Sequence, residues 1–237
     1  MIRLHVLTEG QTELLAVERV LCPHLLGFRV YADARCILTR EHETRYTPAG
    51  AVVKPVRRGG MRSYQQPRRD LERWMKEDAH PECYFTTMLD LYGLPKDFPG
   101  YAAAARCQDP YRRVAALENA MANDIDYYRF IPYIQLHEFE ALLLAEPRQL
   151  DWEYIDHDPA IAALERLVSG CESPELIDDT PDGAPSKRII TAIPEYDGDK
   201  VRVGPEVMGR IGISTLRAKC PHFREWLTRL EALGETC

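Results

Sequence analysis

The hydrophobic and polar positions at the start of the chain follow two successive patterns. Residues 2–7 (IRLHVL) have the apolar, β-prone character of a strand. Gly10 then permits a sharp turn, and apolar residues over 14–21 recur at helical spacing. Thr12 is the expected N-cap of this helix, which should end near residues 26–27. A strand, a glycine turn and a helix are therefore predicted in close succession.

The same patterns continue along the chain. Residues 83–90 (CYFTTMLD) form a continuous apolar run, which is typical of a buried central strand. Further strands are predicted over 28–38 and 130–136, and helices over about 71–79, 111–123, 137–144, 159–168 and 222–233. The sequence thus predicts an α/β fold with a mostly parallel sheet flanked by helices over 1–150. A helical C-terminal extension is expected over 151–237.

Carboxylates follow three of the predicted strands. Glu9 follows the first, Asp90 ends the central one, and Glu138 and Glu140 follow the third, while Glu13 falls in the first turn of the first helix. If the strands are parallel neighbours, these groups meet at one edge of the sheet, where α/β proteins bind ligands. Clustered carboxylates repel one another unless a cation neutralises them, and oxygen ligands suit Mg²⁺ or Mn²⁺. The alternative is that acidic residues at helix starts only complement the helix dipole.

A basic segment interrupts the predicted core over residues 40–69. It has few periodic apolar residues, and Gly59-Gly60 divides it. Such a loop suits phosphate backbones, because cationic side chains supply charge and glycines let the chain conform. The alternative is a solvated surface loop. The candidate nucleic-acid-binding residues here are Lys54, Arg57, Arg58, Arg62, Arg68 and Arg69.

Two later stretches carry further candidate chemistry. Ser186 precedes Lys187 and Arg188, so a serine cap opening a basic helix turn is a candidate phosphate seat. An ordinary capped helix with surface cations is the alternative. His137 is a candidate general base, although histidine is often simply a polar residue at a helix start.

Composition narrows the class of protein. The chain has 237 residues, a net charge of −7, and 45% hydrophobic residues. It contains no apolar run long enough to span a membrane. Seven cysteines without a C-x-x-C pair favour reduced thiols in a cytoplasm. The same Cys-Pro-His tripeptide occurs twice, at 22–24 and 220–222. Together the two could supply four zinc ligands, but one residue between Cys and His is not a standard zinc-ligand spacing.

Several motifs together resemble a known domain. The strand-Glu-Gly turn at 7–10, the Met88-Leu89-Asp90 strand end and the later acidic cluster resemble the TOPRIM domain of topoisomerases, primases and overcoming-lysogenization-defect nucleases. The finer pattern is similar to a bacterial TOPRIM-like family of unknown function, often encoded beside an ATPase in apparent defence neighbourhoods. The stretches that carry this resemblance are Thr8–Glu13, Asp90–Pro95, His137–Leu143, Pro185–Arg188 and Cys220–Phe223.

The resemblance implies metal-dependent phosphodiester chemistry on DNA or RNA. Glu9 would match the TOPRIM glutamate, Asp90 the first aspartate of the D-x-D motif, and Lys187 could stabilise charge on the scissile phosphate. Tyr92 replaces the second aspartate, so Glu138 or Glu140 would supply the missing ligand. Two interpretations follow: a Mg²⁺- or Mn²⁺-dependent nuclease, or a catalytically degenerate subunit of an ATPase partner. The sequence leaves the oligomeric state open, including a homo-oligomer.

Overall fold

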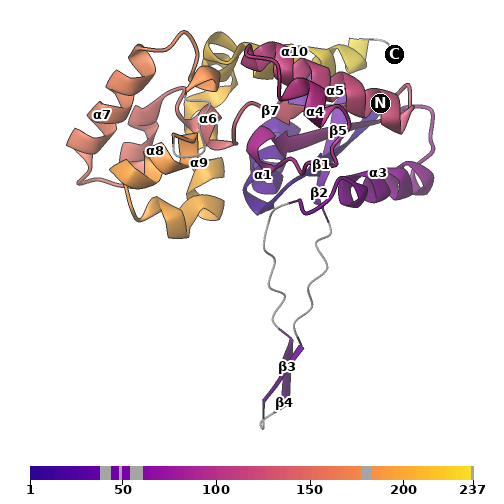
Figure 1. Ribbon diagram of the computed structural model, residues 1–237, viewed down its shortest axis with the longest axis horizontal. Helices are drawn as coiled ribbons and strands as arrows, with labels where there is room; N and C mark the ends of the chain where they lie inside the picture. The colour runs from indigo at the N-terminus through magenta and orange to yellow at the C-terminus, as the bar shows by residue number, and fades with distance from the viewer. Residues whose placement is uncertain (38–43, 48–49, 54–60, 178–182, 236–237) are drawn as a thin grey trace.

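A parallel sheet forms the centre of the computed structural model, which describes residues 1–37, 44–47, 50–53, 61–177 and 183–235 (Figure 1). The strand order is β2-β1-β5-β6, and β7 also pairs with β5. All of these pairings are parallel. The predicted mostly parallel α/β fold is therefore confirmed. The strands are β1 (Ile2–Thr8), β2 (Val30–Cys36), β5 (Cys83–Asp90), β6 (Phe130–Ile131) and β7 (Ile134–Gln135).

Helices connect the strands and form the C-terminal part of the chain. They are α1 (Gln11–Ala16), a π-helical turn (Val17–Leu21), α2 (Cys22–Leu26), α3 (Gln65–Glu77), α4 (Tyr101–Ala104), α5 (Pro110–Ile125), α6 (Glu140–Leu143), α7 (Asp158–Ser169), α8 (Pro185–Ala192), α9 (Tyr196–Lys219) and α10 (Pro221–Ala232). Short 3-10 turns cover Leu91–Gly93, Pro147–Trp152, Pro174–Leu176 and Leu233–Glu235. A separate antiparallel pair consists of β3 (Thr44–Thr47) and β4 (Gly50–Val53). None of the described helices is both long and apolar enough to cross a bilayer.

The sheet carries a hydrophobic core on each face. Side chains alternate along a strand, so Leu4 and Val6 of β1 join one cluster while Leu7 joins the other. The first cluster packs against α1, α2, α9 and α10. The second packs against α3 and α5, through residues such as Trp74 and Leu117. Burial on both faces explains why the strand at 83–90 is apolar throughout.

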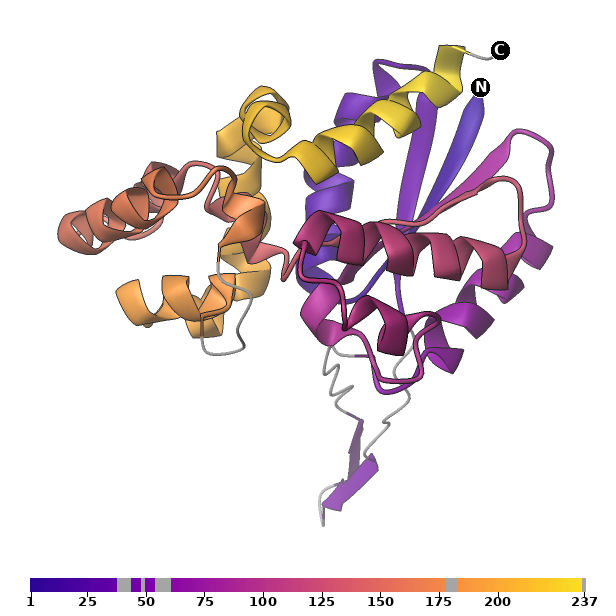
Figure 2. The same cartoon turned by 45° about the horizontal axis from the view of Figure 1, so that its top comes forward.

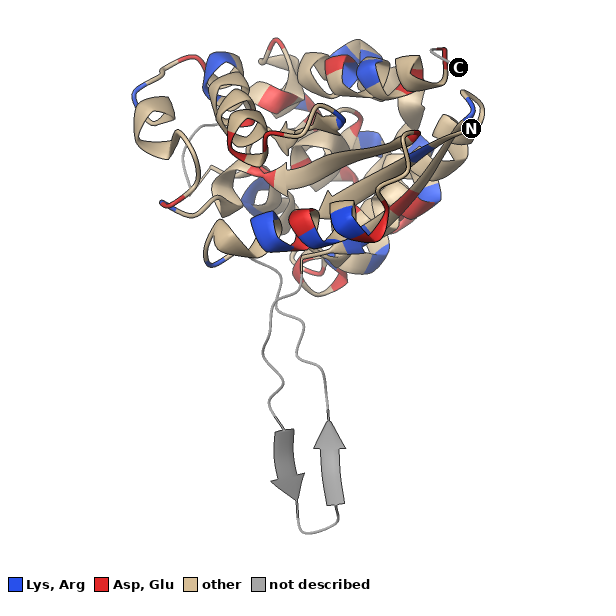
Figure 3. Cartoon of the chain, turned by 90° about the vertical axis from the view of Figure 1, so that its right-hand side faces the viewer, with Lys and Arg blue, Asp and Glu red and all other residues tan. Residues whose placement is uncertain are grey.

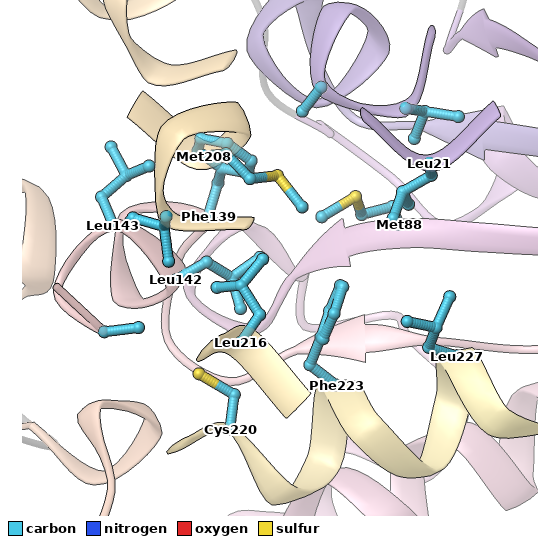
Figure 4. Packing of buried hydrophobic residues seen from close by; sticks show 14 of the residues in the cluster. Leu21, Met88, Phe139, Leu142, Leu143, Met208, Leu216, Cys220, Phe223 and Leu227 are labelled. Carbon is cyan, nitrogen blue, oxygen red and sulfur yellow. The ribbon is translucent and has the colours of Figure 1, made fainter. Parts of the chain in front are cut away.

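The C-terminal helices belong to the same core as the N-terminal strands. Figure 4 shows Met208 of α9 beside Met88 of β5, with Leu216 and Phe223 nearby. In Figure 2, α10 (yellow) returns across the molecule toward the N-terminus. The predicted helical extension is thus confirmed, and one hydrophobic cluster joins it to the sheet. Whether residue 150 marks a domain boundary stays a prediction.

Several predicted boundaries are wrong, for local reasons. The first helix begins at Gln11 with Gly10 as N-cap, because Glu13 rather than Thr12 bonds the free backbone N–H. The strand predicted over 130–136 is split into β6 and β7, since Pro132 cannot donate a ladder hydrogen bond.

Two further boundaries also differ. The helix predicted over 137–144 shrinks to Glu140–Leu143, because His137 adopts a left-handed backbone conformation with φ 60° and Glu138 precedes the helix. Arg68 and Arg69 lie in α3 rather than in a loop.

Trp226 of α10 tests how firmly the C-terminal helices support the sheet. It is 3% exposed, stacks on Tyr133 with ring centroids 4.1 Å apart, and its Nε1 donates to Thr86 Oγ1 at 2.9 Å. We expect Trp226→Ala to lower the free energy of unfolding by roughly 3–5 kcal/mol. Urea unfolding measures this. Trp152→Ala is the control, because that side chain is 69% exposed; equal losses in the two variants would contradict the packing described here.

Candidate functional site

The carboxyl ends of β1, β5 and β7 meet at one edge of the sheet. Thr8 pairs with Met88, and Asp90 pairs with Gln135. Glu9 follows β1 directly, and its backbone N–H donates to the Met88 carbonyl at 3.1 Å. The side chains of Glu9 and Asp90 therefore leave neighbouring strand ends, as their positions in the sequence predict.

The backbone around Glu9 is shaped to hold its carboxylate. Oε2 accepts the Asp90 backbone N–H at 3.1 Å, and the carboxylate also accepts the Met61 backbone N–H. A Cβ on Gly93 would lie 2.3 Å from Glu9 Oε1, so only glycine leaves room for this placement. Burial raises the pKa of Glu9 despite these hydrogen bonds, and the charge of Glu138 raises it further.

Glu13 lies in the first turn of α1. Its Oε2 accepts the Gly10 backbone N–H at 2.8 Å, which satisfies a donor that the helix itself leaves free. Burial, followed by the charge of Glu9, raises the pKa of Glu13 to about 7, while Lys200 acts in the opposite direction. Glu13 therefore caps the helix and also takes part in the acidic cluster.

Glu138 and Glu140 reach the cluster from the segment after β7. The Ser186 backbone N–H, in the first turn of α8, donates to Glu138 Oε2 at 3.0 Å. Glu140 Oε1 accepts the Tyr196 hydroxyl at 3.3 Å and lies 3.7 Å from Lys200 Nζ. Burial raises the pKa of Glu140 to about 7, Lys200 lowers it, and the charge of Glu138 raises it.

Asp90 lies in the field of all the other carboxylates. Burial is the largest cause of its raised pKa, and the charges of Glu13, Glu9, Glu140 and Glu138 follow in that order. Its buried Oδ1 has no hydrogen-bond partner among the described residues. A buried carboxylate oxygen without a donor is costly. The structure thus brings together all five acidic residues that the sequence singled out.

This donor set fits a hard divalent cation. Carboxylate oxygens are the ligands that Mg²⁺ and Mn²⁺ prefer, and a cation would offset both the mutual repulsion and the unpartnered Asp90 oxygen. Among the described residues, no three of the five carboxylates place oxygens that all lie within 4.8 Å of one another. As the carboxylates stand, one ion could therefore be ligated directly by no more than two of them, with waters as the other ligands, a coordination that Mg²⁺ accepts.

One comparison with known proteins gives a match. The model of a family described as a domain of unknown function (DUF4276) matches residues 8–231. The chain belongs to this DUF4276 family. No curated protein and no solved structure matches the chain significantly. The matched range contains all five carboxylates and the helices that complete the cluster.

The other residues predicted for catalysis are placed differently. His137 is fully buried and packs against Tyr92 with ring centroids 5.2 Å apart. Lys187 is exposed. The phosphate seat predicted at Ser186 is wrong in one respect, since the Ser186 N–H already bonds Glu138 and the N-cap is Ala184. Catalytic roles for His137 and Lys187 stay predictions.

The residues predicted to contact nucleic acid fall into three groups: some lie outside the described residues, some are exposed, and some have partners within the protein. Lys54, Arg57 and Arg58 lie outside the described residues. Arg62 and Arg69 are exposed, whereas Arg68 pairs with Glu72 at 3.0 Å and Arg188 Nε donates to the Gly183 carbonyl at 3.2 Å. In Figure 3, basic and acidic positions are mixed over the face that is viewed.

The two Cys-Pro-His stretches do not form a zinc site. They flank the two ends of α10: His222 lies near its start, where Nε2 is 2.9 Å from Glu118 Oε1. His24 lies near its other end, where Nε2 is 2.7 Å from Glu231 Oε1. Each histidine therefore has a carboxylate partner, and about 13 Å of helix separates the two stretches.

Sequence reasoning missed two residues that complete the cluster. Tyr196 and Lys200 stand one turn apart on α9, so both face Glu140. Gly204 allows α9 to approach α1 closely, because a Cβ there would lie 2.8 Å from Thr12 Cγ2. The i, i+4 spacing was readable in the sequence, but nothing local indicated that this helix returns to the sheet edge.

The raised pKa values predict how stability depends on pH. Glu13 and Glu140 hold their protons more tightly in the folded protein than in the unfolded chain, where the pKa is near 4.5. Their contribution is therefore complete at low pH and is lost as pH rises through about 7. Moving the pKa of Glu140 alone from 4.5 to about 7 corresponds to roughly 3 kcal/mol.

We accordingly expect the melting temperature in metal-free buffer to fall by several degrees between about pH 5 and pH 8. Glu140→Gln should flatten this slope, and Mg²⁺ should restore the loss at the higher pH, because it favours the ionised carboxylates. Calorimetry over the pH range, with and without Mg²⁺, tests this. A wild-type protein more stable at pH 8 than at pH 5 without metal would refute it.

Gly93 offers a test of Glu9 placement. We expect Gly93→Ala to displace the Glu9 carboxylate from the Asp90 N–H and to weaken Mn²⁺ binding by about tenfold or more, the loss of roughly 1.4 kcal/mol. Titration calorimetry measures the affinity. Gly198→Ala is the matched control, because a Cβ there meets no atom within 4 Å. Equal affinities for the two variants would mean that Gly93 does not hold Glu9 in place.

Proposed function

We propose that this protein is a metal-dependent phosphodiesterase, acting as a nuclease on DNA or RNA. One observation carries the proposal: five carboxylates converge at the carboxyl edge of parallel strands, and the buried Asp90 Oδ1 has no hydrogen-bond donor within the described structure. Such a cluster is costly to fold. Its retention on one edge is therefore better explained by binding of a cation than by stability.

The residues of the cluster have two proposed roles: some would bind the cation, and Lys200 offsets part of the negative charge. Glu9 and Asp90 would hold Mg²⁺ or Mn²⁺ directly, with Glu138 and Glu140 accepting from its bound waters on the side of α6. When bound, such an ion stabilises charge at a phosphoryl centre and lowers the pKa of water. Lys200 limits the net negative charge beside Glu140.

Two carboxyl groups have proton affinities suited to catalysis at neutral pH. The pKa values of Glu13 and Glu140 are both raised to about 7, where a group can both take and release protons. The Tyr196 hydroxyl holds Glu140 in place, and the Gly10 N–H holds Glu13. These pKa values belong to the metal-free cluster. Glu13, which is not one of the proposed ligands, is the candidate to exchange a proton with a water or leaving group when a cation is bound.

The basic segment supports a nucleic-acid substrate over a small phosphoester. Ile37 and Met61 are fixed at the site: the Ile37 N–H donates to the Thr8 carbonyl at 2.9 Å, and the Met61 N–H donates to Glu9. The chain therefore leaves the sheet edge at Ile37 and returns to it at Met61, and Lys54, Arg57 and Arg58 lie between these two points in the sequence. Arginine and lysine near such a site neutralise backbone phosphates without reading sequence.

A second function has one observation in its favour. Tyr92 stands where the TOPRIM pattern has its second aspartate, and its N–H donates to the His137 carbonyl at 3.0 Å. The backbone at this position is therefore fixed in the fold, but its side chain offers no carboxylate to a metal ion. A chain of this kind would act as a regulatory subunit of an ATPase in a bacterial defence system and would not cleave nucleic acid itself.

Charge-removing variants separate the two functions. We expect Glu9→Gln and Asp90→Asn each to lower Mn²⁺-dependent cleavage of single- or double-stranded DNA and RNA by roughly a hundredfold or more. Both should raise the stability of the metal-free protein at pH 8, because each removes one of five repelling charges. Assays with a panel of labelled nucleic acids and thermal unfolding provide the two measurements.

Glu206→Gln is the matched control, since Glu206 is 44% exposed in a surface pair with Arg19 and such pairs contribute little. Loss of cleavage together with gained stability supports the nuclease. No Mn²⁺ binding and no cleavage by the folded wild type, together with co-purification of an ATPase, would support the regulatory subunit and overturn the nuclease proposal.

A further inference from the structure

A second group of metal-binding side chains lies on the α3 face of the sheet, away from the carboxylate cluster. His5, Asp78 and Cys83 each offer one ligand atom, and these atoms all lie within 4.8 Å of one another. His5 belongs to β1, Asp78 is the C-cap of α3, and Cys83 begins β5. Asp90 is the seventh residue after Cys83 along β5, which is about 23 Å along a strand. The two groups are therefore distinct.

The donor atoms differ in kind from those of the carboxylate cluster. Here they are one imidazole nitrogen, one carboxylate oxygen and one sulfur, a mixture that zinc and similar transition metals accept and Mg²⁺ does not. Ligand atoms around tetrahedral zinc lie about 3.5 Å apart, and His5 Nε2 is 3.0 Å from Asp78 Oδ2. The three donors are thus already close to the spacing that such an ion requires.

The surroundings of His5 match those of a metal-binding histidine. Its Nδ1 contacts Asp33 Oδ1, on the neighbouring strand β2, while Nε2 faces Asp78. A ligating histidine characteristically bonds a carboxylate through its other ring nitrogen, which fixes the ring and the tautomer. Trp74 packs on the same ring with centroids 4.5 Å apart, so the imidazole has little freedom to turn.

Charge and access also fit. A thiolate from Cys83 and the carboxylate of Asp78 would neutralise a divalent ion. Arg3 lies 2.8 Å from Asp78 Oδ1, and its positive charge is offset in the sum by the negative charge of Asp33. Cys83 is fully buried, and the side chains of His5 and Asp78 are 10% and 18% exposed, so an ion here would reach solvent beside Asp78.

We propose that His5 Nε2, Asp78 Oδ2 and Cys83 Sγ bind a zinc-class ion, with Asp33 orienting His5 and water completing the coordination. The ion ties the end of α3 and the start of β5 to β1. The competing explanation is a metal-free hydrogen-bond network, in which His5 lies between Asp33 and Asp78 and the protonated Cys83 thiol bonds the Asp78 carboxylate. Thiolate ligation distinguishes the two.

Cobalt(II) is the probe, because a thiolate ligand gives it an intense charge-transfer absorption. We expect the full-length protein, stripped of metal, to bind one Co²⁺ with this absorption and to lose it when Zn²⁺ is added. Cys83→Ser should abolish the absorption, while Cys107→Ser, which changes a cysteine outside the site, should keep it. Asp33→Asn should weaken Zn²⁺ binding roughly 10–100-fold.

Asp90→Asn separates this site from the carboxylate cluster. It should leave the cobalt absorption unchanged, whatever becomes of nuclease activity. Circular dichroism checks that Cys83→Ser is folded. Asp78→Asn is a second variant, which keeps the thiol but removes a ligand and should weaken Co²⁺ binding. Absence of the charge-transfer absorption in the wild type, or its persistence in folded Cys83→Ser, would overturn the proposal.

Discussion

Repulsion among carboxylates is the constraint on which the rest of this structure depends. Each charge added to the edge of the sheet raises the free energy of ionising the others, most of all Asp90. The fold offsets this with backbone donors rather than with many cations. N–H groups of Asp90, Gly10 and Ser186 each bond one of the carboxylates. Strand ends and helix starts fix these donors, so three of the carboxylates are held in place by backbone N–H groups and not by ion pairs.

The C-terminal helices therefore do more than cover the sheet. α8 supplies the Ser186 N–H, and α9 supplies Tyr196 and Lys200 to Glu140. Their hydrophobic residues pack into the cluster that contains Met88, the residue two positions before Asp90 (Figure 4). The same packing that stabilises these helices also positions their polar groups at the strand ends. An α/β core without these helices would leave Glu138 without the Ser186 N–H, and Glu140 without the Tyr196 hydroxyl and the Lys200 ammonium group.

The sequence predicted the acidic half of the site but not the groups that balance it. Carboxylates at strand ends are visible because parallel strands bring consecutive strand ends to one edge, whatever the loops do. Lys200 and Tyr196 contact Glu140 across 60 and 56 residues, and no local pattern encodes such a contact. The predicted helix boundaries are wrong where a different side chain caps the backbone, as at Gly10, whose N–H bonds Glu13. The sequence predicts a loop at Arg68 because the apolar face of α3 begins only at Pro67 and Leu71.

The two candidate metal groups use the same two strands in chemically different ways. β1 carries His5 in its middle and presents Glu9 just beyond its end, and β5 begins with Cys83 and ends with Asp90. Both strands are central and buried, so their backbones are among the most rigid parts of the molecule. Rigidity alone does not select an ion. Oxygen donors at one end favour a hard cation, whereas nitrogen and sulfur at the other favour a softer one. The length of β5 would keep the two proposed ions apart, and the donor chemistry of each group would select its ion.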